Sequence, residues 1–263
     1  MVKYISATGA TTSEQVREIA RQIRGQKSPT PILGFLACTK TLDGKKPRKT
    51  PERYVGSVKD LRALLVTAKK SGGVRTAVHY SPLSSQEAKQ ISFVDQISRR
   101  LEVFAQNGLC NLLQINADLL SSKKGKKNLY VDQLSFISGE FPRLKYIFPI
   151  QGKHQKWESE GLTDKLGAYD LSKVEYVLLD CSGGRGVSFD LEQTARVYET
   201  IKGTFPYLHV SIAGGLSAEN VSQRRRDLTQ RLGTDDYSLD AEGSFFDGES
   251  FDTGSVVDFL RFS

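Results

Sequence analysis

The sequence is poor in the residue types that mark several protein classes. Its 263 residues include three cysteines, Cys38, Cys110 and Cys181, an odd number with no C-x-x-C spacing. This pattern excludes a disulfide framework and favours reduced thiols in a cytoplasmic protein. The three histidines are not spaced as metal ligands, so we expect no metal, and nothing in the sequence indicates a cofactor.

Long hydrophobic runs are also missing. No apolar stretch reaches the roughly 18 residues of a membrane span, and the start, MVKYISATGATT, lacks the apolar centre of a signal peptide. Positive charge is only mildly in excess, because 37 Lys and Arg against 30 Asp and Glu give a net charge of +7. That balance does not by itself indicate nucleic-acid binding. We expect no membrane partner and a monomer or homodimer.

Short apolar runs alternate with amphipathic segments along the chain. Strands and helices in this order indicate βαβ units and a parallel sheet. Eight such units at this length predict an α/β fold, a (β/α)8 TIM barrel in which residues 1–263 form one domain; an open doubly wound sheet is the alternative. The predicted strands are Lys3–Ala7, Pro31–Cys38, Val74–His79, Asn111–Asn116, Leu144–Ile150, Val174–Asp180, Tyr207–Ile212 and Asp235–Leu239. The predicted helices are Ser13–Ile23, Ser57–Lys70, Ser84–Asn107, Leu129–Gly139, Leu191–Lys202, Ala218–Arg231 and Thr253–Arg261, with a weaker one over 161–169.

The loops that follow the strands form the catalytic face of such a barrel. Asp180 ends a predicted strand and is followed by the glycine-rich stretch GGRG at 183–186. A carboxyl beside a glycine loop that can close over it suits a general acid, although an Asp that caps the next loop has the same pattern. His79 also ends a predicted strand. It is expected either to point to this catalytic face or to be a structural histidine within the strand.

Two further features of these loops suit an anionic ligand. The stretch SIAGGLSAEN places Gly214 and Gly215 between a strand and a helix start, where backbone N–H groups can hold a phosphate. Basic insertions, near 41–50 with KKPRK and near 121–128 with KKGKK, follow the second and fourth strands. Solvated surface loops are the ordinary explanation of each, and their common placement after strands is what favours an anionic ligand. A nucleic-acid partner is not expected, since few aromatic residues lie near these basic loops. If the protein did bind a nucleic acid, these loops would be the binding segments.

Several segments together resemble the phosphoribosylanthranilate isomerase family, a group of (β/α)8 enzymes of tryptophan biosynthesis. VLLDCSGGRGVSFD and SIAGGLSAENV are similar to the family's LLD…GGTG…FDW and AGGL.PENV. ILGFLACTK, TPERYVG, LLQINAD and DDYSLDAEG are similar, in order, to four more of its segments. The matches extend from residue 3 to the C-terminus.

The resemblance implies an Amadori-type aldose–ketose isomerisation of a phosphorylated sugar conjugate. It implies that Asp180 is the general acid and that Arg53 pairs with a substrate carboxylate. It also implies substrate contacts at Gly184 in the glycine loop and phosphate contacts at Gly214 and Gly215.

Three positions depart from the family pattern. Thr8 stands where the family has the cysteine that acts as general base, and a hydroxyl is a poor proton acceptor. Ser238, Leu239 and Asp240 stand where the family has Ser-Ser-Gly, so a carboxylate replaces a phosphate-loop glycine and repels phosphate unless a cation intervenes. Asn116 replaces a common histidine. We count Asn116 and Ser238 among the substrate-binding candidates.

These departures leave three hypotheses open. The first is an isomerase with a displaced base, for which Cys38 and Cys181 are candidates, although both suit ordinary packing. The second is a barrel with different chemistry on a related phosphorylated metabolite. The third is a non-catalytic relative that binds a phosphorylated ligand or a polyanionic partner.

Overall fold

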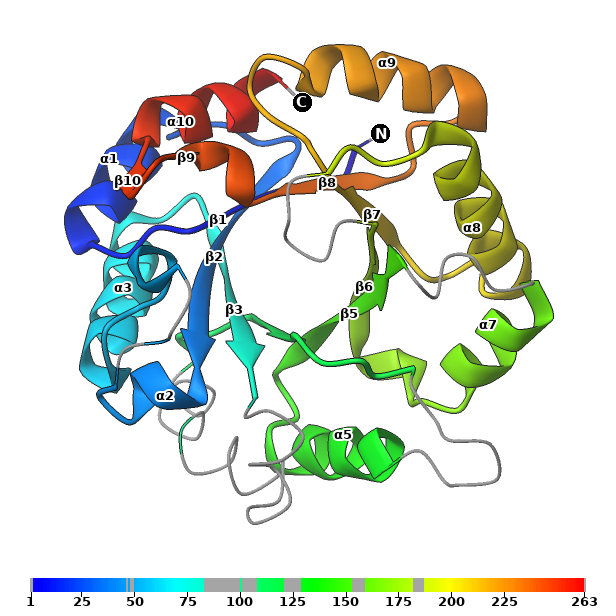
Figure 1. Cartoon of the computed structure of the whole chain (residues 1–263), viewed down its shortest axis with the longest axis horizontal. Coiled ribbons are helices and arrows are strands. Elements are labelled where there is room, and N and C mark those ends of the chain that lie inside the picture. Colours follow the sequence, from blue (N-terminus) through cyan, green and yellow to red (C-terminus); the bar gives the residue numbers. More distant parts are fainter. Residues whose placement is uncertain are drawn as a thin grey trace.

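The chain folds into a closed barrel of eight parallel strands in sequential order, β1 to β8, with helices around it (Figure 1). The computed structural model describes residues 2–45, 47, 50–82, 100, 108–120, 129–152, 159–181 and 187–262. The strands pair with their neighbours in sequence, and β8 closes the ring on β1. The predicted (β/α)8 TIM barrel is confirmed.

Most predicted elements form close to their expected bounds. The barrel strands are β1 Tyr4–Thr8, β2 Thr30–Cys38, β3 Arg75–Ser81, β4 Leu112–Ile115, β5 Lys145–Gln151, β6 Val174–Asp180, β7 Val210–Ala213 and β8 Ser238–Ala241. The helices are α1 Ser13–Gln22, α2 Thr39–Leu42, α3 Val58–Ser71, α5 Leu129–Glu140, α7 Ser159–Gly167, α8 Leu191–Thr204, α9 Val221–Leu232 and α10 Thr253–Phe262. Short 3-10 turns are η1 Pro51–Arg53, η3 Leu171–Lys173 and η4 Gly243–Phe245, and β9 Phe246–Asp247 pairs with β10 Ser250–Phe251.

Local sequence explains where the helices begin. At α1 the Thr12 hydroxyl accepts a hydrogen bond from the backbone N–H of Gln15, whose side chain in turn accepts one from the N–H of Thr12. This reciprocal capping box satisfies two amides that a helix start leaves unpaired. Ser57 and Asp190 cap α3 and α8 more simply, because each side chain accepts one backbone N–H of its helix. Each cap turns the chain from a strand-end loop into a helix that packs back on the barrel.

The structure differs from prediction at β7 and β8. The predicted strand at Tyr207 begins instead at Val210, because Lys202 holds the carbonyls of Pro206 and Leu208 in a turn. The last strand is Ser238–Ala241 rather than Asp235–Leu239. Its pairing with β1 sets Asp240 opposite Ser6, which moves Asp240 from the expected loop into the barrel wall. The predicted helix Ser84–Asn107 lies outside the described residues except at Arg100.

Side chains alternate between the inside and the outside of the barrel. Along β6, Val177 and Leu179 pack in the outer core under the helices, while Tyr176 and Leu178 belong to a separate inner group. This alternation is the two-residue period of a strand. The inner apolar group consists of Tyr4, Ile32, Ala77, Leu112, Ile147, Tyr176, Leu178 and Ala213. It fills the barrel interior, and buried polar residues of the same strands continue toward the mouth.

Polar contacts close the opposite end of the barrel, where the strands begin. The Tyr4 hydroxyl donates to Glu175, and Arg75 forms an ion pair with the same carboxylate at 2.7 Å. His209 Nε2 lies 2.6 Å from the Ser238 hydroxyl, which accepts the backbone N–H of Tyr4. In TIM barrels this end serves stability, whereas the active site lies at the other end, where the strands end. Among the described residues, no helix has both the length and the apolar character to cross a bilayer.

Candidate functional site

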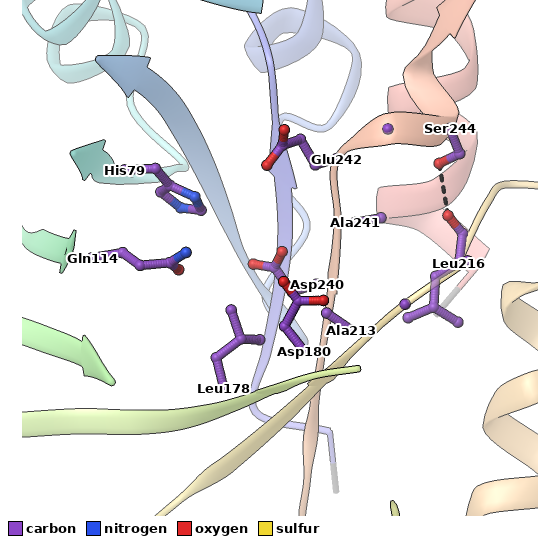
Figure 2. Close-up of a pocket in the computed structure, with 13 residues that line it drawn as sticks. His79, Gln114, Leu178, Asp180, Ala213, Leu216, Asp240, Ala241, Glu242 and Ser244 are labelled. Atoms are coloured by element: carbon purple, nitrogen blue, oxygen red, sulfur yellow. Dashed lines mark hydrogen bonds between the residues drawn. The ribbon is translucent and has the colours of Figure 1, made fainter. Parts of the chain in front are cut away.

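A pocket of about 250 Å³ opens at the mouth of the barrel, where the strands end (Figure 2). It is formed by the last residues of β3, β4, β6, β7 and β8 and by the loops after β7 and β8. The lining residues are His79, Gln114, Leu178, Asp180, Ala213, Gly214, Gly215, Leu216, Asp240, Ala241, Glu242, Gly243 and Ser244. This position is that of the active site in TIM-barrel enzymes.

Asp180 lies in this pocket, as the sequence predicts. It is the last residue of β6 and is held between β5 and β7, paired with Gln151 on one side and Ala213 on the other. Its side chain is half-buried, and Figure 2 shows it beside Asp240 at the centre of the pocket. Asp180 is therefore accessible to a ligand while its backbone is fixed by the barrel.

Asp240 is the deepest carboxyl group of the pocket. It lies in β8, is 4% exposed, and its Oδ2 has no hydrogen-bond partner among the described residues. Burial raises its pKa to about 8, and the neighbouring carboxylates of Glu242 and Asp180 add to the rise while the Ser6 hydroxyl opposes it. A buried carboxyl without a cation avoids its charge by keeping its proton. Asp240 is thus protonated at neutral pH and can donate a hydrogen bond.

Glu242 is the third carboxyl group of the pocket and follows β8 at a spacing of two residues from Asp240. Burial raises its pKa to about 7; the Asp180 charge adds to this, and the Arg53 guanidinium lowers it. Arg53 itself lies over the Phe246 ring, 4.8 Å from the ring centroid, and is not a lining residue. A group with a pKa near 7 is present in both protonation states, as acid–base catalysis requires.

His79 and Gln114 face the carboxyl groups from the other side of the pocket (Figure 2). They are paired neighbours on β3 and β4, and both are buried. Burial lowers the pKa of His79 to about 4, so its imidazole is neutral near pH 7. The Gln114 amide donates to Asn116 Oδ1 at 2.7 Å, which leaves Gln114 Oε1 without a partner among the described residues. His79 lines the pocket where the strands end, which is the face that the sequence predicts for it.

Thr8 lies near the pocket without lining it. Its hydroxyl oxygen is 3.4 Å from His79 Nε2, and the residue is fully buried. Gly34 leaves the space that both need, since a Cβ there would lie 2.0 Å from Thr8 Oγ1. Thr8 is thus packed behind a pocket residue, and its hydroxyl contacts the His79 imidazole.

Gly214 and Gly215 line the pocket as predicted, and local packing also requires glycine at both positions. Their φ angles are 122° and 62°. A Cβ at Gly214 would lie 2.6 Å from Cys181 Sγ, and one at Gly215 would lie 2.7 Å from Ser188 Cα. The Asn220 side chain holds this turn by donating to the Gly215 carbonyl and accepting from the N–H of Ser217. Phosphate binding at the two glycines stays a prediction.

The remaining predicted site residues lie elsewhere. Ser238 is at the start of β8, with its hydroxyl bonded to Tyr4 and His209. Asn116 supports Gln114 rather than lining the pocket, and Cys38 contacts Thr41 beyond the end of β2. Gly184 and its glycine loop, and most of both basic insertions, lie outside the described residues.

Cys181 does not line the pocket either. Its thiol contacts the carbonyls of Val187 and Ala213, and burial raises its pKa. A raised pKa makes a thiol a weaker source of thiolate. Within the described part of the chain, no three His, Cys, Asp or Glu side chains are grouped to hold a metal ion.

Sequence reasoning did not single out Glu242 and Gln114. The stretch LDAEG carries Asp240 and Glu242 two residues apart, which places both on one face of an extended chain. The sequence pattern predicts a strand that ends at Leu239, so Asp240 and Glu242 fall in the predicted loop after it and their two-residue spacing carries no signal there. For Gln114 the signal is a different one. In LLQIN a single polar residue interrupts an apolar strand, which indicates a side chain that faces a polar part of the barrel interior.

Known structures show the same fold. Phosphoribosylanthranilate isomerase from Pyrococcus furiosus matches with a TM-score of 0.56 at 15% identity, over 98% of this chain and 96% of that chain. The enzyme from Thermococcus kodakaraensis matches with a TM-score of 0.57 at 15% identity, over 99% and 98%. Tryptophan synthase subunit alpha from Legionella pneumophila matches with a TM-score of 0.57 at 9% identity, over 99% and 91%. No family model and no curated protein matches the sequence. At these identities the similarity shows the TIM-barrel fold alone.

Proposed function

We propose that the protein is an isomerase that moves protons on a sugar conjugate, by the Amadori-type aldose–ketose rearrangement that the sequence resemblance implies. The observation that carries the proposal is the group of three carboxyls, Asp180, Asp240 and Glu242, at one pocket in the barrel mouth. Two of them have pKa values of about 8 and about 7. Pairs of titratable groups with separated pKa values near neutrality are typical of acid–base sites.

The reaction needs a donor to the ring oxygen and an acceptor for the proton on C2. Asp180 keeps the role of general acid in this proposal. Glu242 takes the role of the base, because its pKa of about 7 leaves an ionised fraction that can accept a proton at neutral pH. The protonated Asp240 donates a hydrogen bond to the substrate beside them. The proton taken from C2 balances the one given to the ring oxygen and leaves an enolamine. When the enolamine becomes the ketone, C1 gains a proton and the C2 hydroxyl loses one, so no net proton is consumed.

This assignment replaces the base at Thr8. The Thr8 hydroxyl is buried against Gly34 and His79, outside the lining residues, so it does not reach a ligand in the pocket. The phosphate of the implied substrate is proposed at the backbone of Gly214 and Gly215. Arg53 is proposed to pair with a carboxylate of the conjugate, and its position over Phe246 near Glu242 supports a location at the rim.

Turnover of phosphoribosylanthranilate tests the proposal, because its consumption removes the fluorescence of the substrate. Asp180→Asn and Glu242→Gln are each expected to lower kcat by about 100-fold or more, the usual effect of losing a general acid or base. Glu249→Gln is the control, because this exposed carboxylate lies in the turn between β9 and β10. Wild-type activity that survives both pocket variants would exclude the carboxyl mechanism.

A binding protein without turnover is the second candidate. The residue at position 8 favours it, since a buried threonine stands where the resembled family has its base. In that case the wild type shows no turnover, yet a sugar phosphate raises its melting temperature. A salt-sensitive shift with RNA would instead indicate a polyanionic partner for the basic loops.

A further inference from the structure

Two neutral polar side chains enter the pocket from β3 and β4. His79 and Gln114 are paired neighbours on these strands, and Figure 2 shows both side chains pointing into the pocket. The residues are 1% and 6% exposed. His79 Nδ1 and Gln114 Oε1 each lack a hydrogen-bond partner among the described residues. Buried polar atoms are nearly always hydrogen-bonded, so this pair points to a ligand that bonds to both.

The pair begins where the inner face of the barrel turns from apolar to polar. Ala77 and Leu112, two residues earlier on the same strands, belong to the inner apolar group. Side chains two residues apart share one face of a strand. Further apolar side chains would serve packing alone, as Leu178 does where β6 reaches the same pocket. The polarity of His79 and Gln114 therefore serves what the pocket holds.

Neighbouring side chains fix how Gln114 is turned. Its amide nitrogen donates to Asn116 Oδ1 at 2.7 Å, and Asn116 Nδ2 lies 3.5 Å from Ser81 Oγ. A carboxamide held by its nitrogen offers its oxygen to a ligand, so Gln114 acts as an acceptor.

The ring of His79 is held through its other nitrogen. Nε2 lies 3.4 Å from Thr8 Oγ1, and a Cβ at Gly34 would lie 3.0 Å from Nε2, which leaves the ring little room to move. Burial lowers the pKa of His79 to about 4, so the ring is neutral and has one N–H donor and one acceptor nitrogen. The contact with Thr8 thus decides which nitrogen carries the proton.

The barrel topology indicates which end of a sugar phosphate reaches this pair. In the ring of eight sequential strands, β3 and β4 lie opposite β7 and β8. Gly214 and Gly215, the proposed phosphate site, follow β7 and line the same pocket as His79 and Gln114. A sugar whose C5 phosphate lies at the two glycines extends across the mouth, so its C1–C2 end lies toward β3 and β4.

We propose that His79 and Gln114 bind the C2 hydroxyl of a sugar phosphate: His79 Nδ1–H donates to the hydroxyl oxygen, and the hydroxyl donates to Gln114 Oε1. Thr8 is a positioning residue, whose hydroxyl donates to Nε2 and keeps the ring proton on Nδ1. A hydroxyl is both donor and acceptor, which complements this pair. The inference rests on the proposed function for the sugar phosphate and its orientation. It adds the residues that select a 2-hydroxy sugar and hold the carbon from which Glu242 takes a proton.

Calorimetry with ribose 5-phosphate and 2-deoxyribose 5-phosphate tests the inference, because the two probes differ only in the C2 hydroxyl. We expect ribose 5-phosphate to bind at least about tenfold tighter, since the deoxy sugar loses two hydrogen bonds and leaves two buried atoms unpaired. Arabinose 5-phosphate, the C2 epimer, should bind about as weakly as the deoxy sugar. Equal affinity for the three sugars, or no binding of ribose 5-phosphate, overturns the inference.

Variants of close volume assign the selectivity to the pair. His79→Leu and Gln114→Met are each expected to lower the ribose-to-deoxyribose affinity ratio by about threefold or more. His209→Leu is the matched control, because His209 is also a buried histidine with a hydroxyl contact, 2.6 Å from Nε2 to Ser238 Oγ, at the opposite end of the barrel. It should leave the ratio unchanged. An unchanged ratio in His79→Leu and Gln114→Met, or an equal fall in His209→Leu, contradicts the assignment.

The role of Thr8 has its own readout. Thr8→Val should lower the affinity ratio and Thr8→Ser should keep it, which a loss of stability alone would not produce. Nitrogen NMR, with the His79 signals identified by their absence in His79→Leu, should show the ring proton on Nδ1; a proton on Nε2 overturns the assigned roles. Selectivity for ribose 5-phosphate without turnover of phosphoribosylanthranilate would reject the proposed reaction and keep the hydroxyl site. Turnover with equal sugar affinities would reject this inference alone.

Discussion

The Thr8 hydroxyl oxygen lies 3.4 Å from Nε2 of His79, and both side chains are buried where β1 and β3 approach the barrel mouth. His79 Nδ1 has no partner among the described residues, so this contact is the one that orients the ring. Thr8 thus serves as a support for a pocket residue.

Removing the Thr8 hydroxyl should therefore destabilise the fold and loosen His79. Thr8→Val keeps the shape of the side chain and is expected to lower the free energy of unfolding by about 1 kcal/mol, the usual value for one buried hydrogen bond. Thr8→Ser, which keeps the hydroxyl, should lose less. Urea denaturation measures both. If the two variants have equal stability, the hydroxyl makes no such contribution.

Gly34 is expected to tolerate no side chain. A Cβ there would lie 2.0 Å from Thr8 Oγ1 and 3.0 Å from His79 Nε2, so Gly34→Ala must displace one of them. We expect a loss of about 2 kcal/mol or more, in the range of overpacked cores. Gly203→Ala is the matched control: Gly203 is exposed in α8 with no atom near its Cβ position, and alanine should stabilise that helix by up to about 1 kcal/mol. Thermal unfolding of both variants gives the comparison, and a stable Gly34→Ala protein would contradict it.

The fold could be predicted because the barrel depends on patterns that sequence carries directly. Apolar runs of strand length alternate with capped amphipathic helices, and β6 begins and ends where the pattern places it, at Val174–Asp180. Asp180 also reaches the pocket because it ends a strand, and Gly214 and Gly215 reach it because they follow one.

The carboxyl group at β8 could not be predicted in the same way. Asp240 lies in the barrel wall because β8 pairs with β1 opposite Ser6, a contact between opposite ends of the chain. Local propensity instead favours a loop for DAEG at 240–243, since Asp and Gly are depleted in strands. The raised pKa values of Asp240 and Glu242 depend on burial and on Asp180, which only the closed barrel brings near.

The contacts at the opposite end of the barrel are expected to stabilise the fold without affecting the pocket. Arg75 pairs with Glu175, which also accepts from Tyr4, and this ion pair is partly buried. Arg75→Met should lower the free energy of unfolding by about 1–2 kcal/mol, since Glu175 then keeps only part of its hydrogen bonding. Arg21→Met removes an exposed ion pair with Glu18 and should cost almost nothing. Equal losses, or a change in ligand affinity for Arg75→Met, would contradict this separation of roles.

Asp240 should make the folded protein less stable as pH rises. Its pKa is about 8 in the folded state, against about 3.9 for an ordinary aspartate, so between these values the folded protein holds a proton that the unfolded chain has released. Stability contributed by this proton is complete below about pH 4 and is lost progressively as pH rises toward about 8. Asp240→Asn cannot ionise, so its free energy of unfolding should exceed that of the wild type by an amount that grows with pH.

The comparison of the two proteins is clearest above about pH 6.5. Below that pH, His79 and His209, whose pKa values are lowered to about 4, make the free energy of unfolding rise with pH, which opposes the effect of Asp240. Glu242→Gln should show the same trend as Asp240→Asn but level off nearer pH 7, where Glu242 titrates in the folded state. Urea denaturation at a series of pH values measures each difference from the wild type. Parallel profiles for wild type and Asp240→Asn would mean that Asp240 is already ionised in the folded protein, and the pocket would then need a cation nearer than Arg53.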